Sequence, residues 1–145
     1  MNDLTRIELL EARTQIADVV YRYAQAIRNG DFASGVGLFA EDAMFEIRLA
    51  VPGQPNSATT RSKLVGHAAI LAYLNEAFAA GGSVCPMISN LIIDVQGRKG
   101  SSNCMMTAMV WANGQNVIGE YHDTFAYDGA WRFASRTYTI FRARS

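Results

Sequence analysis

The chain has 145 residues, half of them hydrophobic, and its 13 basic residues are balanced by 13 acidic ones. This length suits a single domain, so we expect one domain over residues 1–145 with its own hydrophobic core. The balanced charge argues against a nucleic-acid-binding protein, and no apolar run approaches the length needed to span a bilayer.

The first part of the chain is predicted to be helical. Apolar residues recur at helical spacing from Leu4 to Arg28, and Asn29 and Gly30 supply a stop signal. Asp31 can cap a second, shorter helix that ends near Ala40. We therefore expect two consecutive helices before the first strand.

A strand and a third helix are predicted next. Alternating residues indicate a strand from Asp42 to Leu49, and the polar segment from Val51 to Lys63 is typical of an excursion or a hairpin. Apolar spacing then predicts a helix from Gly66 to Ala80, closed by Gly81 and Gly82.

The rest of the chain is predicted to be strand. Four runs are joined by turn signals, the pattern of an antiparallel meander. The runs are Val84 to Val95, Ser101 to Ala112, Asn116 to Tyr127 and Trp131 to Arg142. Helices followed by a long antiparallel sheet indicate an α+β fold, in which helices cover one sheet face and leave a pocket between the two layers.

The last two strands place ionisable groups inside an apolar hairpin. Asp128 and Gly129 predict a two-residue turn, which fixes the two faces by alternation. One face then carries Tyr121, Asp123, Phe125, Arg136 and Tyr138. The other carries Glu120, His122, Thr124, Trp131 and Phe133. We expect the first face to line the pocket, and the aromatic strip of Trp131 and Phe133 to form a homodimer.

The cysteines and the missing motifs bear on location and cofactors. Cys85 and Cys104 have neither metal-site nor redox spacing, and the first residues lack the layout of a signal peptide, so we expect a cytoplasmic protein with free thiols. No phosphate-binding glycine loop or nucleophile elbow occurs, so we expect no metal and no cofactor. The expected partners are a small hydrophobic molecule and a second copy of the chain.

The whole pattern resembles the SnoaL-like proteins of the cystatin-like α+β cone superfamily, which is named after nuclear transport factor two. The resemblance is carried by Ile16 to Asp31, Leu38 to Ala43, Gly66 to Ile70, Gly119-x-Tyr121-x-Asp123, Trp131 to Phe133, and Arg136. It implies a cone-shaped α+β barrel, with three N-terminal helices packed on a long, curved, mostly antiparallel sheet around an apolar pocket. The family includes dehydratases, isomerases, polyketide cyclases, epoxide hydrolases and non-catalytic members.

The resemblance also implies roles for single residues. In ketosteroid isomerase-like members, residues that look like Tyr23 and Asp123 form an oxyanion hole, but the general base would fall at Ile47. In scytalone dehydratase-like and dehydrochlorinase-like members, the Asp and His of the catalytic dyad would fall at Arg28 and Pro86, so this dyad is absent. Arg136 matches an arginine that lines the pocket in those members.

Two functional hypotheses follow from these residues. The first is a cofactor-independent isomerase, cyclase or dehydratase acting on a small apolar carbonyl or polyketide-like substrate. Asp123 would be its acid or base, while Tyr23 and Arg136 would stabilise negative charge. The expected substrate contacts are Tyr121, Phe125, Tyr138, Ile47 and Asn90.

The second hypothesis is a non-catalytic ligand-binding or assembly module, in which Asp123 is only the structural partner of Arg136. A ring-hydroxylating dioxygenase small subunit is a third option, although the chain looks short for that role.

Overall fold

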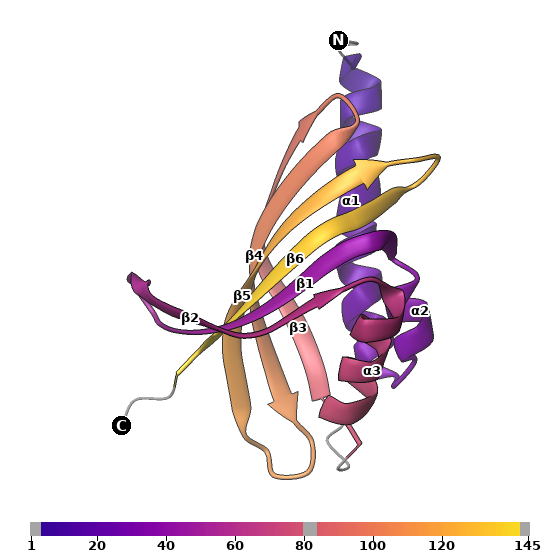
Figure 1. The fold of residues 1–145 in the computed structure, drawn as a ribbon. Helices are drawn as coiled ribbons and strands as arrows, with labels where there is room; N and C mark the ends of the chain where they lie inside the picture. Colours follow the sequence, from indigo (N-terminus) through magenta and orange to yellow (C-terminus); the bar gives the residue numbers. More distant parts are fainter. Residues whose placement is uncertain (1–3, 80–83, 143–145) are drawn as a thin grey trace.

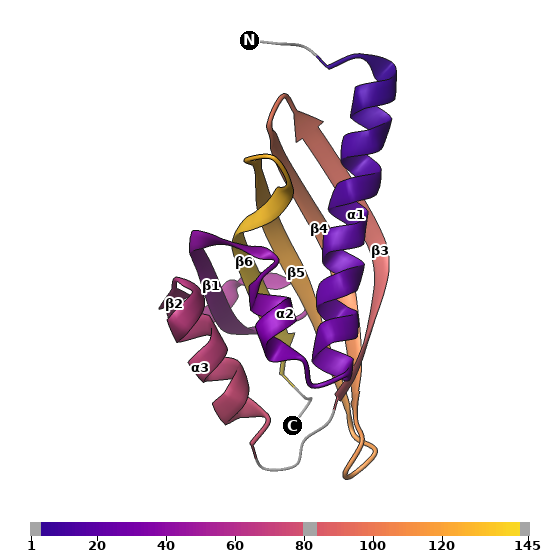
Figure 2. The same cartoon turned by 90° about the vertical axis from the view of Figure 1, so that its right-hand side faces the viewer.

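The structure is a computed structural model that describes residues 4–79 and 84–142. Three helices lie on one face of a six-stranded sheet, which confirms the α+β fold (Figures 1 and 2). The helices are α1 (Arg6–Arg28), α2 (Phe32–Val36) and α3 (His67–Ala77). The strands are β1 (Phe39–Val51), β2 (Gln54–Val65), β3 (Val84–Gln96), β4 (Lys99–Val110), β5 (Asn116–Tyr127) and β6 (Trp131–Phe141). None of the described helices is long and apolar enough to cross a membrane.

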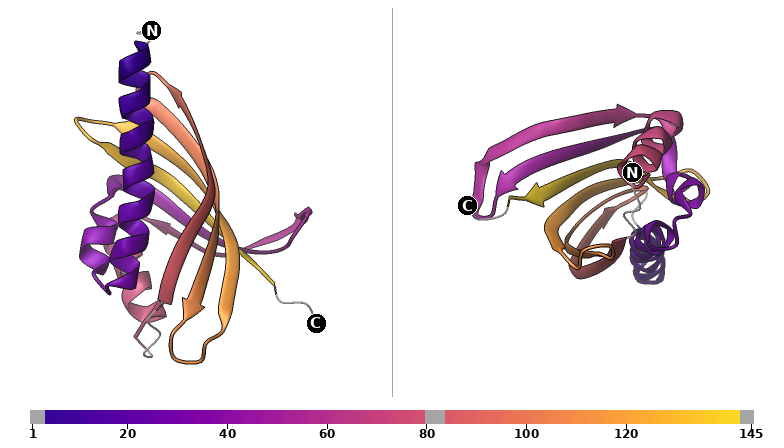
Figure 3. Two further views of the ribbon diagram at one scale, coloured as in Figure 1. Left: turned by 180° about the vertical axis from the view of Figure 1, so that it is seen from behind. Right: turned by 90° about the horizontal axis from the view of Figure 1, so that it is seen from below.

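The sheet is curved but open. Its strand order is β2-β1-β6-β5-β4-β3, with β1 parallel to β6 and the other neighbouring pairs antiparallel. Because β2 and β3 are the edges, the sheet wraps partly around the helices without closing (Figure 3). The expected cone-shaped α+β fold is therefore confirmed, with a sheet that curves around the helices but stays open.

The first helix forms as its sequence predicts. Thr5 caps it, and Thr5 and Glu8 make a reciprocal capping box that satisfies two backbone N–H groups at the start of the helix. The helix runs without a break to Arg28 and ends at Asn29. Its buried stripe of Ile16, Val20 and Tyr23 faces the sheet and supplies one wall of the core.

The segment after α1 differs from the prediction. Helix α2 ends at Val36 and not near Ala40, because Phe39 already belongs to β1, where it is 1% exposed and pairs with Phe133. The polar segment from Val51 to Lys63 resolves into β2 and its turn, so the hairpin interpretation is the correct one. The third helix is confirmed but ends at Ala77. Its predicted end at Ala80 and the stop at Gly81 and Gly82 lie outside the described residues.

The β5–β6 hairpin has a different register from the predicted one. Tyr127 pairs with Trp131, so the loop holds three residues and not two. Phe125 pairs with Phe133 but Thr124 with Ser135, which leaves Ala134 as a bulge. The bulge reverses the alternation along β6.

Trp131 and Phe133 of β6 consequently lie on the concave, helix-covered face. Trp131 is 7% exposed and Phe133 is fully buried against Phe39 and Tyr23. Their predicted place on the outer face is wrong, because the longer turn and the bulge allow these large apolar rings to be buried. Tyr121, Asp123, Phe125, Arg136 and Tyr138 do share the concave face, as predicted.

Candidate functional site

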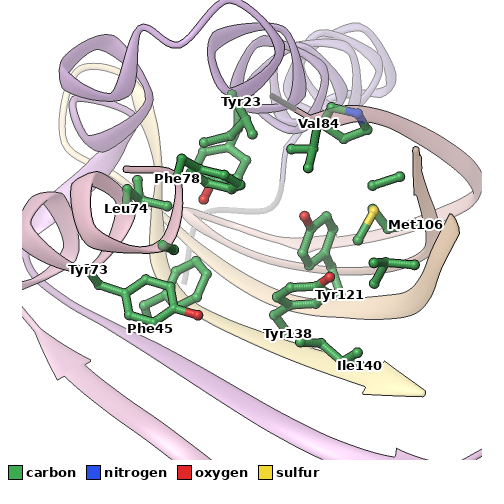
Figure 4. A pocket seen from close by; sticks show the side chains of 15 residues that line it. Tyr23, Phe45, Tyr73, Leu74, Phe78, Val84, Met106, Tyr121, Tyr138 and Ile140 are labelled. Carbon is green, nitrogen blue, oxygen red and sulfur yellow. The ribbon is translucent and has the colours of Figure 1, made fainter. Parts of the chain in front are cut away.

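A pocket of about 210 Å³ lies between α1, α3 and the concave face of the sheet (Figure 4). Its walls are mainly apolar, with Ile27 and Leu74 from the helices and Met106 and Ile140 from the strands. Among the described residues that line it, no side chain is an Asp, Glu, His, Lys or Arg. Apolar cavities of roughly 150 Å³ hold benzene, so this larger pocket has room for a molecule of one substituted ring or of two small fused rings.

Four tyrosines supply the polar groups of the pocket. The hydroxyls of Tyr23, Tyr73, Tyr121 and Tyr138 point toward its interior (Figure 4). Burial raises the pKa of each phenol, and it raises that of Tyr121 to about 12. No hydrogen bond to a described residue contributes to these shifts. The four groups therefore stay protonated near neutral pH and can donate hydrogen bonds to a ligand.

An ion pair lies beneath this pocket and outside its lining. The Arg136 guanidinium donates to the Asp123 carboxylate from Nε at 2.7 Å and from Nη2 at 2.9 Å, and both side chains are completely buried. Asp123 and Arg136 are direct partners in the β5–β6 register. Burial alone would lower the pKa of the guanidinium, but the charge and hydrogen bonds of Asp123 raise it above its ordinary value. The arginine is therefore always charged.

Aromatic rings enclose the guanidinium. Its central carbon lies 3.7 Å from the ring centre of Tyr121, 4.3 Å from that of Phe133 and 4.7 Å from that of Tyr23. Two buried polar atoms of the described chain have no hydrogen-bond partner, namely Nη1 of Arg136 and Oγ of Ser102. Ser102 is the register partner of Asp123 on β4, so the row Ser102, Asp123 and Arg136 crosses three strands under the pocket floor.

The predicted site residues divide into four groups. Tyr23, Tyr121 and Tyr138 line the pocket, while Asp123 and Arg136 lie beneath it. Phe125 and Ile47 are buried in the core and do not line the pocket. Asn90 is exposed in a bulge of β3 with φ of 54°, so the expectation of a buried amide there is wrong.

Other candidates lie away from the pocket. His122 is mostly exposed on the convex face, where its Nε2 lies 3.3 Å from Glu120. Glu46 is buried on the same face and accepts hydrogen bonds from Thr60 and Arg48. Among the described residues, no three potential metal ligands of the His, Cys, Asp and Glu types lie together.

Sequence analysis missed Tyr73, Phe45 and Phe78 as lining residues. Tyr73 comes from α3 and Phe45 from β1, and both meet the pocket through tertiary packing. Tyr73 lies next to Leu74 in the apolar stripe of α3, and that position is the only signal that would have indicated it.

Comparison with known proteins agrees with this geometry. Residues 8–137 match the SnoaL-like domain, which is most of the chain. The chain belongs to the SnoaL-like family. A comparison with curated proteins gives no match.

Solved structures share the fold. A protein provisionally described as the β subunit of an aromatic-ring-hydroxylating dioxygenase from Novosphingobium aromaticivorans has a TM-score of 0.78 and 18% identity, covering 94% of this chain and 93% of that one. An NTF2-like protein with a cystatin-like fold from the same organism has a TM-score of 0.74 and 23% identity, covering 100% and 94%.

A third similar structure contains a small ligand. It is a protein from Catenulispora acidiphila in complex with S-DNPA, with a TM-score of 0.71, 18% identity and coverage of 90% and 94%. The fold of this SnoaL-like chain is thus shared with proteins of different descriptions, and the fold alone does not select a reaction.

Proposed function

We propose that this SnoaL-like protein binds a small, mostly apolar molecule that carries an aromatic or unsaturated ring system and an oxygen substituent. The observation that supports this function best is the composition of the pocket, because its polar groups are the hydroxyls of four protonated tyrosines set in apolar walls. Phenol hydroxyls donate to carbonyl, enol or phenol oxygens, and the apolar walls favour the ring.

The ionic pair under the pocket supports binding more than proton transfer. A general acid or base must reach the reacting atom by a hydrogen bond, and the Asp123 carboxylate already accepts two from Arg136. In this function Asp123 holds Arg136 in place, and the tyrosines above them contact the ligand.

An isomerase, cyclase or dehydratase is the second candidate. It is favoured by the buried carboxylate of Asp123, which shares one face of β5 with Tyr121. In that case Asp123 would exchange the proton, while Tyr23 and Arg136 would stabilise the developing negative charge. Such a mechanism requires that Arg136 release Asp123 when the substrate binds.

We further propose a cytoplasmic homodimer that uses the convex sheet face. Trp131 and Phe133 do not contribute, because both are buried. Exposed apolar residues of this face include Met87 and Ile118, which pair with Thr107 from either side across β3, β4 and β5.

Fluorescent phenols test the binding function. We expect wild-type protein to bind 2-naphthol more tightly than naphthalene, because only the former accepts and donates hydrogen bonds. Tyr23→Phe should weaken 2-naphthol binding about fivefold, the value of one hydrogen bond of about 1 kcal/mol. Affinity is measured by titration of the naphthol fluorescence.

Tyr21→Phe is the matched control, since Tyr21 lies on the exposed side of the same helix. It should bind 2-naphthol as wild type does. The proposed function would be contradicted if wild-type protein bound neither probe. It would also be contradicted if the Tyr23→Phe and Tyr121→Phe variants both bound 2-naphthol as tightly as wild type does.

A further inference from the structure

Arg136 lies against the rings of two pocket tyrosines as well as against its ion-pair partner. Its guanidinium faces the Tyr121 ring at 3.7 Å and the Tyr23 ring at 4.7 Å, and both of these phenols reach the pocket with their hydroxyls (Figure 4). Asp123 approaches from another direction, through the edge formed by Nε and Nη2. The guanidinium therefore contacts the two tyrosine rings in addition to its salt-bridge partner.

The Asp123 carboxylate balances the charge of Arg136 but does not satisfy all of its hydrogen-bond donors. Nη1 is buried and has no hydrogen-bond partner among the described residues, although a guanidinium offers five N–H donors. A buried donor without a partner is costly, and a buried ion pair is often no more stable than well-packed apolar residues of similar size. Fold stability alone therefore gives little reason for a charged pair at this position.

We propose that Arg136 is a specificity-determining residue that acts through Tyr121 and Tyr23 and makes the pocket favour ligands whose oxygen carries more negative charge. This inference rests on the proposed function of the pocket. A cation over an aromatic face draws electron density from the ring, and in a low-dielectric interior the effect on a phenol hydroxyl is large. The hydroxyl then becomes a stronger hydrogen-bond donor, and phenolate- or enolate-like oxygens gain more from it than neutral ether oxygens.

The surrounding titratable groups are consistent with this role. Burial is the first cause of the raised pKa of Tyr121, and Arg136 opposes it more strongly than Asp123 reinforces it. The same balance between Arg136 and Asp123 acts on Tyr23. The other groups near this region are Tyr73 from α3, Cys104 from β4 and Tyr138 from β6, and the pKa of each is raised above its ordinary value. Arg136 is thus the charge that strengthens the hydroxyls of Tyr121 and Tyr23 as hydrogen-bond donors.

The probe that tests this is 4-nitrophenol, whose neutral and ionised forms absorb at different wavelengths. The pKa of the bound probe is read from a pH titration of its absorbance. We compare wild type with the double variant Asp123→Leu/Arg136→Met, which removes both charges together. The bound probe should have a pKa about one unit lower in wild type, a roughly tenfold greater preference for the ionised form. Binding of 4-nitroanisole, which cannot ionise, should be the same in both proteins.

Two further variants separate this role from general charge effects. Arg132→Met removes a cation from the same strand whose partners, Asp128 and the Gly37 carbonyl, lie outside the pocket lining, and it should leave the bound pKa unchanged. Tyr121→Phe keeps Arg136 but removes the hydroxyl, and it should raise the bound pKa toward that of the double variant. A Tyr121→Phe variant with the wild-type bound pKa overturns the inference even where the double variant does not fold.

Equal bound pKa values in wild type and the double variant would overturn the inference, and so would a Tyr121→Phe variant that behaves as wild type. Both of these results require that the probes bind. If wild type binds neither 4-nitrophenol nor 4-nitroanisole, the proposed function itself fails and takes the inference with it.

Discussion

At the scale of single residues, the structure favours a different role for Asp123 from the one that its place in the sequence first suggests. Its place in an apolar hairpin suggests an acid or a base, whereas the structure has it in a bidentate pair with Arg136. Removal of one partner from a fully buried pair leaves the other charge without compensation, which is far more costly than removal of both.

The Asp123→Asn variant tests which role dominates. If Asp123 is a structural partner, Asp123→Asn should lower the free energy of unfolding by about 3 kcal/mol, because Arg136 then lies buried without a counter-charge. For a chain of this length the loss corresponds to a fall in Tm on the order of 10 °C. The measurement is a thermal melt followed by circular dichroism.

The double variant Asp123→Leu/Arg136→Met serves as the control, and it should melt closer to wild type than Asp123→Asn does. An Asp123→Asn variant that keeps the wild-type Tm but loses turnover of a substrate would support the catalytic candidate in place of the structural one.

At the scale of elements, the close approach of β5 and β6 shapes the pocket. Gly119 of β5 lies where an added Cβ would be 2.9 Å from Cε1 of Tyr138 and 2.5 Å from the backbone oxygen of Thr139. A backbone oxygen cannot move aside as a flexible side chain can. The absence of a side chain at Gly119 therefore lets the Tyr138 ring lie against the sheet and line the pocket.

Gly119→Ala should consequently destabilise the protein by about 1–3 kcal/mol, the usual cost of overpacking. It should also weaken 2-naphthol binding, because Tyr138 is displaced. Gly35→Ala is the matched control, since its Cβ would be no closer than 3.5 Å to its neighbours and alanine favours the helix. Chemical denaturation of both variants gives the comparison, and equal stability of Gly119→Ala and wild type would contradict the steric argument.

At the scale of the whole molecule, the helices cover only one face of the sheet. The convex face of the described strands has Met87 at 59% exposure and Ile118 at 50%, and Trp111 directly after β4 is 69% exposed. Six strands of this length present roughly 1,000 Å², and a stable dimer needs about 800 Å² from each partner. The face is therefore large enough for a second copy.

We expect a dimer mass in light scattering at micromolar concentration, and Ile118→Glu should shift the protein to monomer because it places a charge in the apolar contact. Ile7→Glu introduces the same charge at another exposed apolar residue, on α1, and should remain dimeric. A wild-type monomer would contradict the proposed assembly.

The sequence by itself determined the α+β class, the long first helix and the four consecutive strands, because these depend on local periodicity and on turn residues. It also indicated that Tyr23 lies on the core-facing stripe of the first helix, and that Tyr121 and Tyr138 lie on the pocket side of the sheet. The single domain over residues 1–145 and the cytoplasmic location stay predictions.

Only the tertiary structure decided the register of the last hairpin, and with it the character of the site. The three-residue turn and the bulge at Ala134 bury Trp131 and Phe133 among side chains from α1 and β1, contacts that no local pattern contains. The same register makes Arg136 the direct partner of Asp123, so a candidate acid becomes half of an ion pair. Burial of large rings against distant elements outweighed the local preference for a two-residue turn. The free energy gained by burying the rings exceeds the free-energy difference between the two turn types.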